Sequence, residues 1–300
     1  LQAHRPSPGQ DDLRGFEWRF FWKLGQGDSF QTFRGHSDYV TSVAFSPDGR
    51  LLASASTDHT VKIWDVTRRV IVDTLSVPAT EAASVAFSPD GVFLATGSRD
   101  ADLKLWNAKT RKPARALKGR PLQIVFSRTN DMVAFASAAG GISNHLKLWS
   151  YSTDQEAFSL PGTAYCMAFS PDGKVLVTAD SNRMLTFWDV AARREIRSIH
   201  MPSPIASLSY SPDGTKLVTS HYGGEVHLRE AVTGAPLASL PGQTMTVFKT
   251  AFSPDGKTVA TAGADQTLRL WDANTLNEIA TLRGHENEIL ALEFSPDGKS

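Results

Sequence analysis

The chain has 300 residues, of which 41% are hydrophobic, and its 31 basic side chains balance 31 acidic ones. This balance removes the broad positive field that nucleic-acid binders and membrane-surface proteins usually carry, so neither kind of partner is expected. A single cysteine, Cys166, excludes an intrachain disulfide and leaves the compartment open, although we favour the cytoplasm. No apolar run approaches the ~20 residues that span a bilayer.

The first residues precede the repetitive part of the chain. We interpret residues 1–19 as a leader or junction from an upstream region, and residues 20–300 as one domain. Residues 20–24 and 30–33 read as two strands, because Trp22 stands fourteen residues before His36, as Trp271 stands before His285.

A repeat of about 42 residues follows. Its anchors are seven aromatic residues spaced 39 to 43 apart: Phe45, Phe87, Phe126, Phe169, Tyr210, Phe252 and Phe294. Six of them are followed by Ser-Pro-Asp-Gly, in which proline presets φ, aspartate bonds nearby backbone and glycine tolerates a positive φ. The phrase predicts a hairpin turn, and we call it the SPDG turn.

Within the first unit, alternating apolar and polar residues predict strands at 40–45, 51–56, 61–66 and 70–75. A tryptophan, or Arg229 in the fifth unit, stands 19 residues after the anchor in five of the first six units. In the third unit it stands 23 after, which places four extra residues within 138–145. Four-stranded sheets that cannot bury both faces alone are expected to pack around an axis and close a ring.

The last unit is incomplete. Residues 288–294 predict its first strand, and together with 20–24 and 30–33 they would form a closing blade shared between both ends of the chain. That blade would lack its second strand, since the sequence given stops two residues after its turn.

Gly35-His36, Ser54, Asp58 and Trp64-Asp65 together resemble the WD40 repeat. The resemblance covers about 20–300 and implies an all-β fold, a seven-bladed WD40 β-propeller. It also implies a structural tetrad in which Asp58 binds His36, His36 binds Ser54 and Ser54 accepts from Trp64. A hydrolase triad of Ser54, His36 and Asp58 is the alternative, but their spacing from Trp64 matches the tetrad.

Other chemistry is weakly indicated. His221 and His227 flank a turn and could share a metal, but two imidazoles without a third ligand favour surface histidines, so no metal or cofactor is expected. Basic residues after the tryptophan strands share a rim with the aspartates of the SPDG turns, which favours a solvated face.

Binding residues are expected in loops at the mouth opposite the SPDG turns. The position six residues before each anchor holds Tyr39, Glu81, Arg120, Thr163, Pro204, Thr246 and Glu288. Apart from Pro204, these are the candidate partner-binding residues.

The WD40 resemblance implies a non-catalytic platform for a protein or peptide, in a monomeric ring. The alternative is a propeller enzyme of the metal-dependent hydrolase or lactonase type. Residues 12–18 resemble the junction before WD40 regions in large bacterial proteins, some of them serine/threonine kinases. That resemblance implies a docking or sensing module of a bacterial signalling protein.

Overall fold

The computed structural model describes residues 32–77, 82–98, 101–119, 121–137, 145–153, 155–162, 164–240 and 245–300. These residues form 24 strands in six antiparallel sheets of four strands, which we number blades 1 to 6. Blades 1 to 3 comprise β1 (Val40–Phe45), β2 (Leu51–Ser56), β3 (Thr60–Asp65), β4 (Val70–Ser76), β5 (Ala82–Phe87), β6 (Phe93–Ser98), β7 (Leu103–Asn107), β8 (Pro113–Leu117), β9 (Pro121–Phe126), β10 (Met132–Ser137), β11 (His145–Ser150) and β12 (Gln155–Pro161). Blades 4 to 6 comprise β13 (Cys166–Phe169), β14 (Val175–Ala179), β15 (Met184–Asp189), β16 (Arg194–His200), β17 (Ile205–Tyr210), β18 (Lys216–His221), β19 (Val226–Glu230), β20 (Pro236–Leu240), β21 (Val247–Phe252), β22 (Thr258–Gly263), β23 (Leu268–Asp272) and β24 (Glu278–Leu282).

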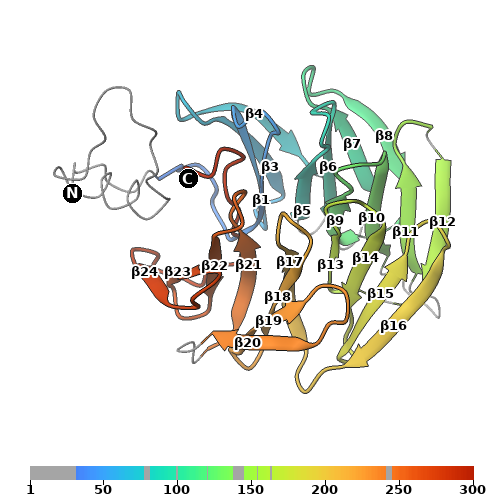
Figure 1. Ribbon diagram of the computed structural model, residues 1–300. Coiled ribbons are helices and arrows are strands. Elements are labelled where there is room, and N and C mark those ends of the chain that lie inside the picture. Colours follow the sequence, from blue (N-terminus) through green and yellow to red (C-terminus); the bar gives the residue numbers. More distant parts are fainter. Residues whose placement is uncertain are drawn as a thin grey trace, which may run out of the picture.

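The blades stand around a central opening, and the chain visits them in order (Figure 1). The first strand of each blade lies innermost and neighbours the first strand of the next blade. The core lies between blades: Ala53 and Ile63 of blade 1 pack with Leu94 and Trp106 of blade 2 in one buried cluster. Neither blade could bury these side chains alone, so each is stabilised by its neighbours.

The SPDG turn has the predicted form, as the first one shows. Gly49 has φ of 70°, and its amide donates to the Ser46 carbonyl at 2.8 Å. The Ser46 hydroxyl donates to Asp48 at 2.6 Å and accepts from the amide of Leu51 at 2.9 Å. Serine and aspartate therefore satisfy the polar groups of the turn locally, and glycine supplies the left-handed backbone.

The described residues form six complete blades, not the seven that the repeat predicts. Residues 283–300 contain no strand, although the turn after Phe294 closes, with Ser295 donating to Asp297 at 2.7 Å. Residues 20–24, and the first two of 30–33, lie outside the described part of the chain, and Thr32 and Phe33 are not in a strand. Within the described residues, the segment before the last SPDG turn pairs with no second strand.

The segment nevertheless occupies the place of an inner strand between blade 6 and blade 1 (Figure 1). The Ile289 amide donates to the Gly263 carbonyl of blade 6 at 3.1 Å. The Phe45 amide of blade 1 donates to the Glu293 carboxylate at 2.9 Å. The C-terminal segment thus bridges the first and last complete blades.

Candidate functional site

The four tetrad residues of blade 1 meet in one chain of hydrogen bonds. Trp64 Nε1 donates to Ser54 Oγ at 2.8 Å, and His36 Nε2 lies 2.7 Å from the same oxygen. His36 Nδ1 lies 2.8 Å from Asp58 Oδ2. Ser54 is 4% exposed, and the side chains of His36 and Asp58 are 6% and 7% exposed. The hydroxyl is therefore enclosed and already occupied, which supports a structural interpretation of these residues over a nucleophilic one.

The charge state of Asp58 fixes the direction of these bonds. Burial alone would raise its pKa, but hydrogen bonds from Thr60, His36 and the Ser37 amide outweigh burial and hold the pKa well below its usual range. An ionised carboxylate can only accept, so His36 donates from Nδ1, and in the neutral imidazole Nε2 then accepts from Ser54. Ser54 then accepts from Trp64, and every member of the chain is satisfied.

Other blades retain the bond between tryptophan and hydroxyl. In blades 2, 4 and 6 the indole donates at 2.9 Å to a threonine ten residues earlier: Trp106 to Thr96, Trp188 to Thr178 and Trp271 to Thr261. In blade 5, Arg229 Nε donates at 3.2 Å to Thr219, which also lies 3.3 Å from His221 Nε2. Arginine thus takes over the donor role of the missing tryptophan. Asp100 of the second unit lies outside the described residues.

Blade 3 departs from this arrangement. Trp149 pairs with Val133 across the sheet, as Trp64 pairs with Leu52, so Phe135 stands where blade 1 has Ser54. The buried Trp149 Nε1 has no hydrogen-bond partner, and neither has the buried hydroxyl of Ser127 in the turn that lacks Pro-Asp-Gly. Blade 3 is therefore the least well satisfied of the described blades.

Of the six predicted partner-binding residues, three lie in the part of the chain that the structure describes. Tyr39 is 50% exposed immediately before β1, and Glu288 is exposed in the C-terminal segment. Thr246 is half-buried, and its hydroxyl donates to the Tyr222 carbonyl at 2.8 Å, so loops of blades 5 and 6 touch. Glu81, Arg120 and Thr163 lie outside the described residues.

Three exposed residues at the same mouth were missed by the sequence reasoning. Tyr165 precedes β13 and is 52% exposed; Met245 lies two residues before β21 and is 51% exposed. Tyr222 follows β18 and is 51% exposed; its amide donates to the carbonyl of Pro204, the residue before β17. Inner strands begin at this mouth, so Tyr39, Tyr165, Tyr222 and Met245 together form a mouth group. The signal in the sequence is a tyrosine or methionine in a loop, at a position other than the sixth before the anchor.

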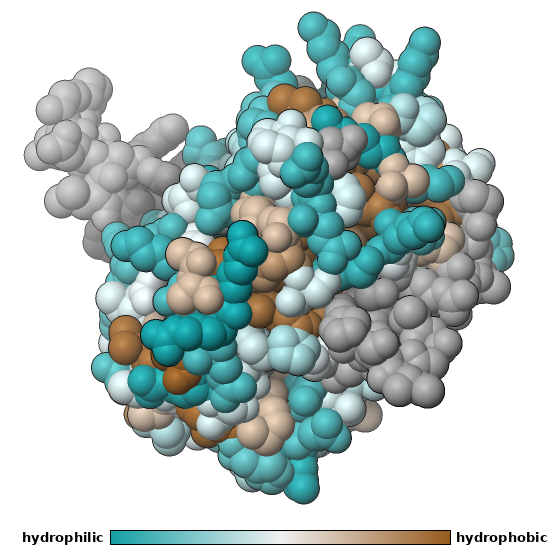
Figure 2. All heavy atoms as spheres, turned by 90° about the vertical axis from the view of Figure 1, so that its right-hand side faces the viewer, coloured by the Kyte–Doolittle hydropathy of each residue, from teal (hydrophilic) through white to brown (hydrophobic). Residues whose placement is uncertain are grey.

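The flank of the ring has a different character. Figure 2 shows the side that lies at the right of Figure 1, and hydrophilic atoms dominate it, with hydrophobic atoms in small groups between them. This is the ordinary pattern of a solvated surface.

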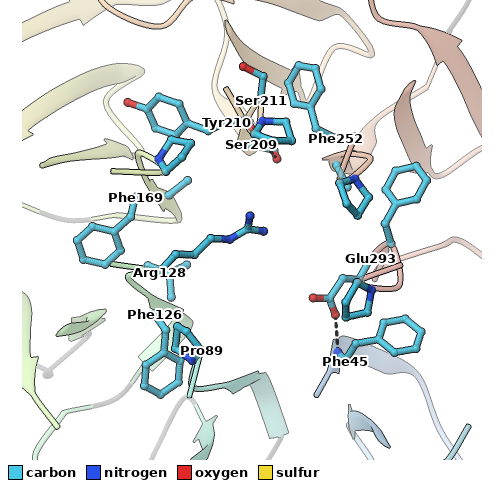
Figure 3. Close-up of a pocket in the computed structure, with 18 of the residues that line it drawn as sticks. Phe45, Pro89, Phe126, Arg128, Phe169, Ser209, Tyr210, Ser211, Phe252 and Glu293 are labelled. Atoms are coloured by element: carbon cyan, nitrogen blue, oxygen red, sulfur yellow. Dashed lines mark hydrogen bonds between the residues drawn. The ribbon is translucent and has the colours of Figure 1, made fainter. Parts of the chain in front are cut away.

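The mouth at the SPDG turns opens into a cavity of about 600 Å³. Anchor rings and SPDG prolines supply most of its wall, together with small residues of the inner strands. Figure 3 shows two charged side chains within it: Arg128 reaches into the middle, and Glu293 lies across from it with its carboxylate bonded to the Phe45 amide. Desolvation by the surrounding protein raises the pKa of Glu293 to about 7, while the hydrogen bond from the Phe45 amide and the charge of Arg128 act to lower it.

The sequence favours surface positions for both histidines of blade 5, but of the two only His227 is partly exposed. His221 is fully buried, and its ring meets that of His227 at a centroid distance of 5.1 Å. Burial lowers the pKa of His221 to about 4, and its Nδ1 lies 3.0 Å from the Ser203 hydroxyl. In the described part of the chain no three His, Cys, Asp or Glu side chains come together in a group that could hold a metal ion.

Comparison with known proteins identifies the repeat. The family described as "WD domain, G-beta repeat" matches residues 27–65, 72–107, 155–189, 234–272 and 276–300. A helix of the length and hydropathy needed to cross a bilayer is not found among the described residues.

Several eukaryotic proteins are similar to the chain. Periodic tryptophan protein 2 of Saccharomyces cerevisiae is 35% identical over 200 residues, which cover 65% of this chain and 22% of that protein. The protein of that name from Arabidopsis thaliana is 23% identical over 227 residues, 74% of this chain and 21% of its own length. WD repeat-containing protein AAC3 of Dictyostelium discoideum is 28% identical over 189 residues, 60% of this chain and 39% of its own.

The chain thus spans about a fifth of the periodic tryptophan proteins that it matches. Because these relatives are eukaryotic, they do not support the resemblance to bacterial kinase-linked proteins. The family match extends over more than half of the chain, in register with the blades. The chain belongs to the WD40 family.

Proposed function

We propose that the chain is a docking module that binds a protein partner through the mouth opposite the SPDG turns. The observation that carries this proposal is the mouth group, Tyr39, Tyr165, Tyr222 and Met245, in which each side chain is half-exposed. Tyrosine presents a large apolar surface and a polar tip at low cost in conformational entropy, and it is enriched among residues that dominate binding energies. The strands of the ring form a rigid scaffold that positions the loops that carry these side chains.

The charged and polar residues expected at this mouth belong to the same proposal. Glu288 is exposed in the segment that bridges blades 6 and 1, and Thr246 joins the loops of blades 5 and 6. Arg120, Glu81 and Thr163 remain predictions, as do the monomeric state and a role within a signalling protein. A bacterial setting has no support from the relatives.

The alternative class, a propeller enzyme of the metal-dependent hydrolase or lactonase type, requires ligands that converge on the channel. Among the described residues, no such group of three is present. The Ser54 hydroxyl is enclosed within the tetrad, where a substrate cannot reach it. No specific observation favours this second function.

Site-specific crosslinking tests the proposal. A photoreactive phenylalanine analogue is placed at Tyr165 or Tyr222, and in a control at Val232, which is 71% exposed in the turn after β19. In an extract of the producing cells, both tyrosine positions are expected to capture the same protein, and Val232 is not. The affinity of the purified partner is then expected to fall about tenfold or more for Tyr222→Ser, because a truncated anchor typically costs more than about 1 kcal/mol.

The matched control for affinity is Val232→Ser, which removes an exposed apolar side chain on the side of the ring that carries the SPDG turns. Equal capture from all three positions, or an affinity that Tyr165→Ser and Tyr222→Ser leave unchanged, would contradict the proposal.

A further inference from the structure

The cavity at the SPDG mouth is lined by repeat positions that are almost uniform around the ring. The residue two places after the anchor is proline in six units: Pro47, Pro89, Pro171, Pro212, Pro254 and Pro296. In the third unit it is Arg128. The residue before the anchor is small in six units, namely Ala44, Ala86, Val125, Ala168, Ser209 and Ala251, and it is Glu293 in the seventh. Both charged side chains of the cavity therefore stand where the repeat places uncharged residues.

Arg128 and Glu293 do not satisfy each other. No ion pair is drawn between these two side chains in Figure 3, and Glu293 Oε2 accepts from the Phe45 amide at 2.9 Å. Arg128 is exposed, and its guanidinium extends into the open middle of the cavity (Figure 3). An arginine held among proline and alanine side chains presents a planar fork of N–H donors, which matches a carboxylate in two parallel hydrogen bonds.

A lysine, Lys249, stands on β21, on the same face of the strand as Ala251 of the cavity wall. Lys249 precedes Ala251, which lines the cavity, by two residues, so the pleat turns both toward the channel. Burial lowers the pKa of Lys249, as expected for an ammonium group that protein surrounds. The inner strand of blade 6 thus carries a lysine farther from the SPDG rim than Ala251.

The acidic groups at this mouth oppose an incoming carboxylate only weakly. The aspartates of the SPDG turns accept bonds from their own turns, as Asp48 does from Ser46 and from the Arg50 amide. Two of them also face lysines of the same turns, Asp172 with Lys174 and Asp297 with Lys299. Glu293 accepts from the Phe45 amide, so part of its charge is already met within the protein.

We propose that this cavity binds a carboxylate of a partner protein, with Arg128 pairing with the carboxylate and Glu293 accepting a hydrogen bond from an N–H group of the same segment. The carboxylate can be that of a chain end or of an aspartate or glutamate side chain, since both present the same two oxygens. The ring of prolines and small residues supplies apolar contacts for the neighbouring backbone. This site lies at the other end of the channel from the mouth group, so the two proposals can fail separately.

Titration of the isotope-labelled protein with three short peptides tests the proposal. The probes are acetyl-trialanine with a free carboxylate, the same peptide as its amide, and an acetylated Ala-Glu-Ala amide. The backbone amide of Phe45, which bonds to Glu293, is the NMR reporter. At least one carboxylate peptide is expected to bind about tenfold or more tightly than the uncharged amide, because a hydrogen bond to a charged group contributes about 1.5–3 kcal/mol. A preference for the free end or for the glutamate peptide identifies the source of the carboxylate.

Arg128→Gln is expected to remove this preference, and Arg50→Gln to keep it, since Arg50 is an exposed arginine beside the first SPDG turn. Both substitutions are at exposed positions, and far-ultraviolet circular dichroism checks that the ring is intact. The proposal is wrong if neither carboxylate peptide binds better than the amide, or if Arg128→Gln leaves the preference unchanged. The part of the proposal that names a protein partner is also wrong if acetate binds as tightly as the carboxylate peptides.

Discussion

Asp58 ends the hydrogen-bond chain of blade 1, and its carboxylate holds His36 in place for Ser54 and Trp64. Asp58→Ala removes the carboxylate acceptor and leaves the buried imidazole N–H with only the Thr60 hydroxyl, 3.3 Å away. We expect a loss of about 1–3 kcal/mol in the free energy of unfolding at neutral pH, measured by urea denaturation. Because the pKa of Asp58 is depressed in the folded state, its contribution is present above the unfolded pKa, near 4, and is lost as the pH falls further. The difference from wild type should therefore shrink in acid.

Glu286→Ala is the matched control, since Glu286 is an exposed carboxylate in the loop before Ile289. It should leave the denaturation midpoint unchanged at every pH. If Asp58→Ala is as stable as this control at neutral pH, the carboxylate has no structural role and the tetrad interpretation is wrong.

Single residues differ in how well the sequence predicts them. The contacts of His36, Ser54 and Asp58 follow from their spacing to Trp64, because the geometry of a blade repeats with the sequence. The repeat does not predict a role for Arg128 or Glu293, because the pattern that the other units share is uncharged at both positions. The two charged residues stand where single units depart from the repeat. They lie in one cavity only because the folded ring brings the third and seventh units together.

Among the blades, blade 3 has a tryptophan whose indole N–H is buried without an acceptor, whereas the Trp188 indole of blade 4 donates to Thr178. Replacing either tryptophan by phenylalanine exchanges the indole for a smaller ring and removes the same atoms at both positions. Only Trp188→Phe also breaks a hydrogen bond and leaves Thr178 without its donor. We expect Trp188→Phe to cost about 1–2 kcal/mol more than Trp149→Phe, measured by chemical denaturation followed by circular dichroism.

Equal costs for the two substitutions would show that the tryptophan-to-threonine bond contributes nothing beyond ring packing. The pair is its own control, because the two side chains hold the same repeat position after their anchors apart from the insertion in the third unit.

At the scale of single elements, the sequence predicts strands and turns well, since alternation and the SPDG phrase act locally. The rebuilt network of Arg229, Thr219 and His221 was not predicted, because it depends on contacts between three strands and loops.

Closure of the whole ring depends on the C-terminal segment. The number of anchors predicts seven units. In the part of the chain that the structure describes, six blades have complete sets of strands, and the seventh place is occupied by a segment held through a few contacts. A count of repeats cannot show whether a unit has enough strands to pair, since pairing needs a neighbour at ~4.8 Å on at least one side. The sequence therefore predicts the architecture and the place of the seam, but not the state of the chain within it.

Ile289 tests this closure. It is 6% exposed and stands five residues before its anchor, the position that Ile205 holds in complete blade 5, where it is 2% exposed. Ile289→Ala and Ile205→Ala should each lower the free energy of unfolding, by about 2–5 kcal/mol for a well-packed site. We expect the cost at Ile289 to be the smaller one and hydrogen exchange to rise selectively in β1 and β21, because the bridging segment can open without unfolding the rest. Ile205→Ala should instead raise exchange around blades 4 and 5, where its side chain packs. If Ile289→Ala leaves the protection of β1 and β21 as it is in wild type, the segment does not close the ring.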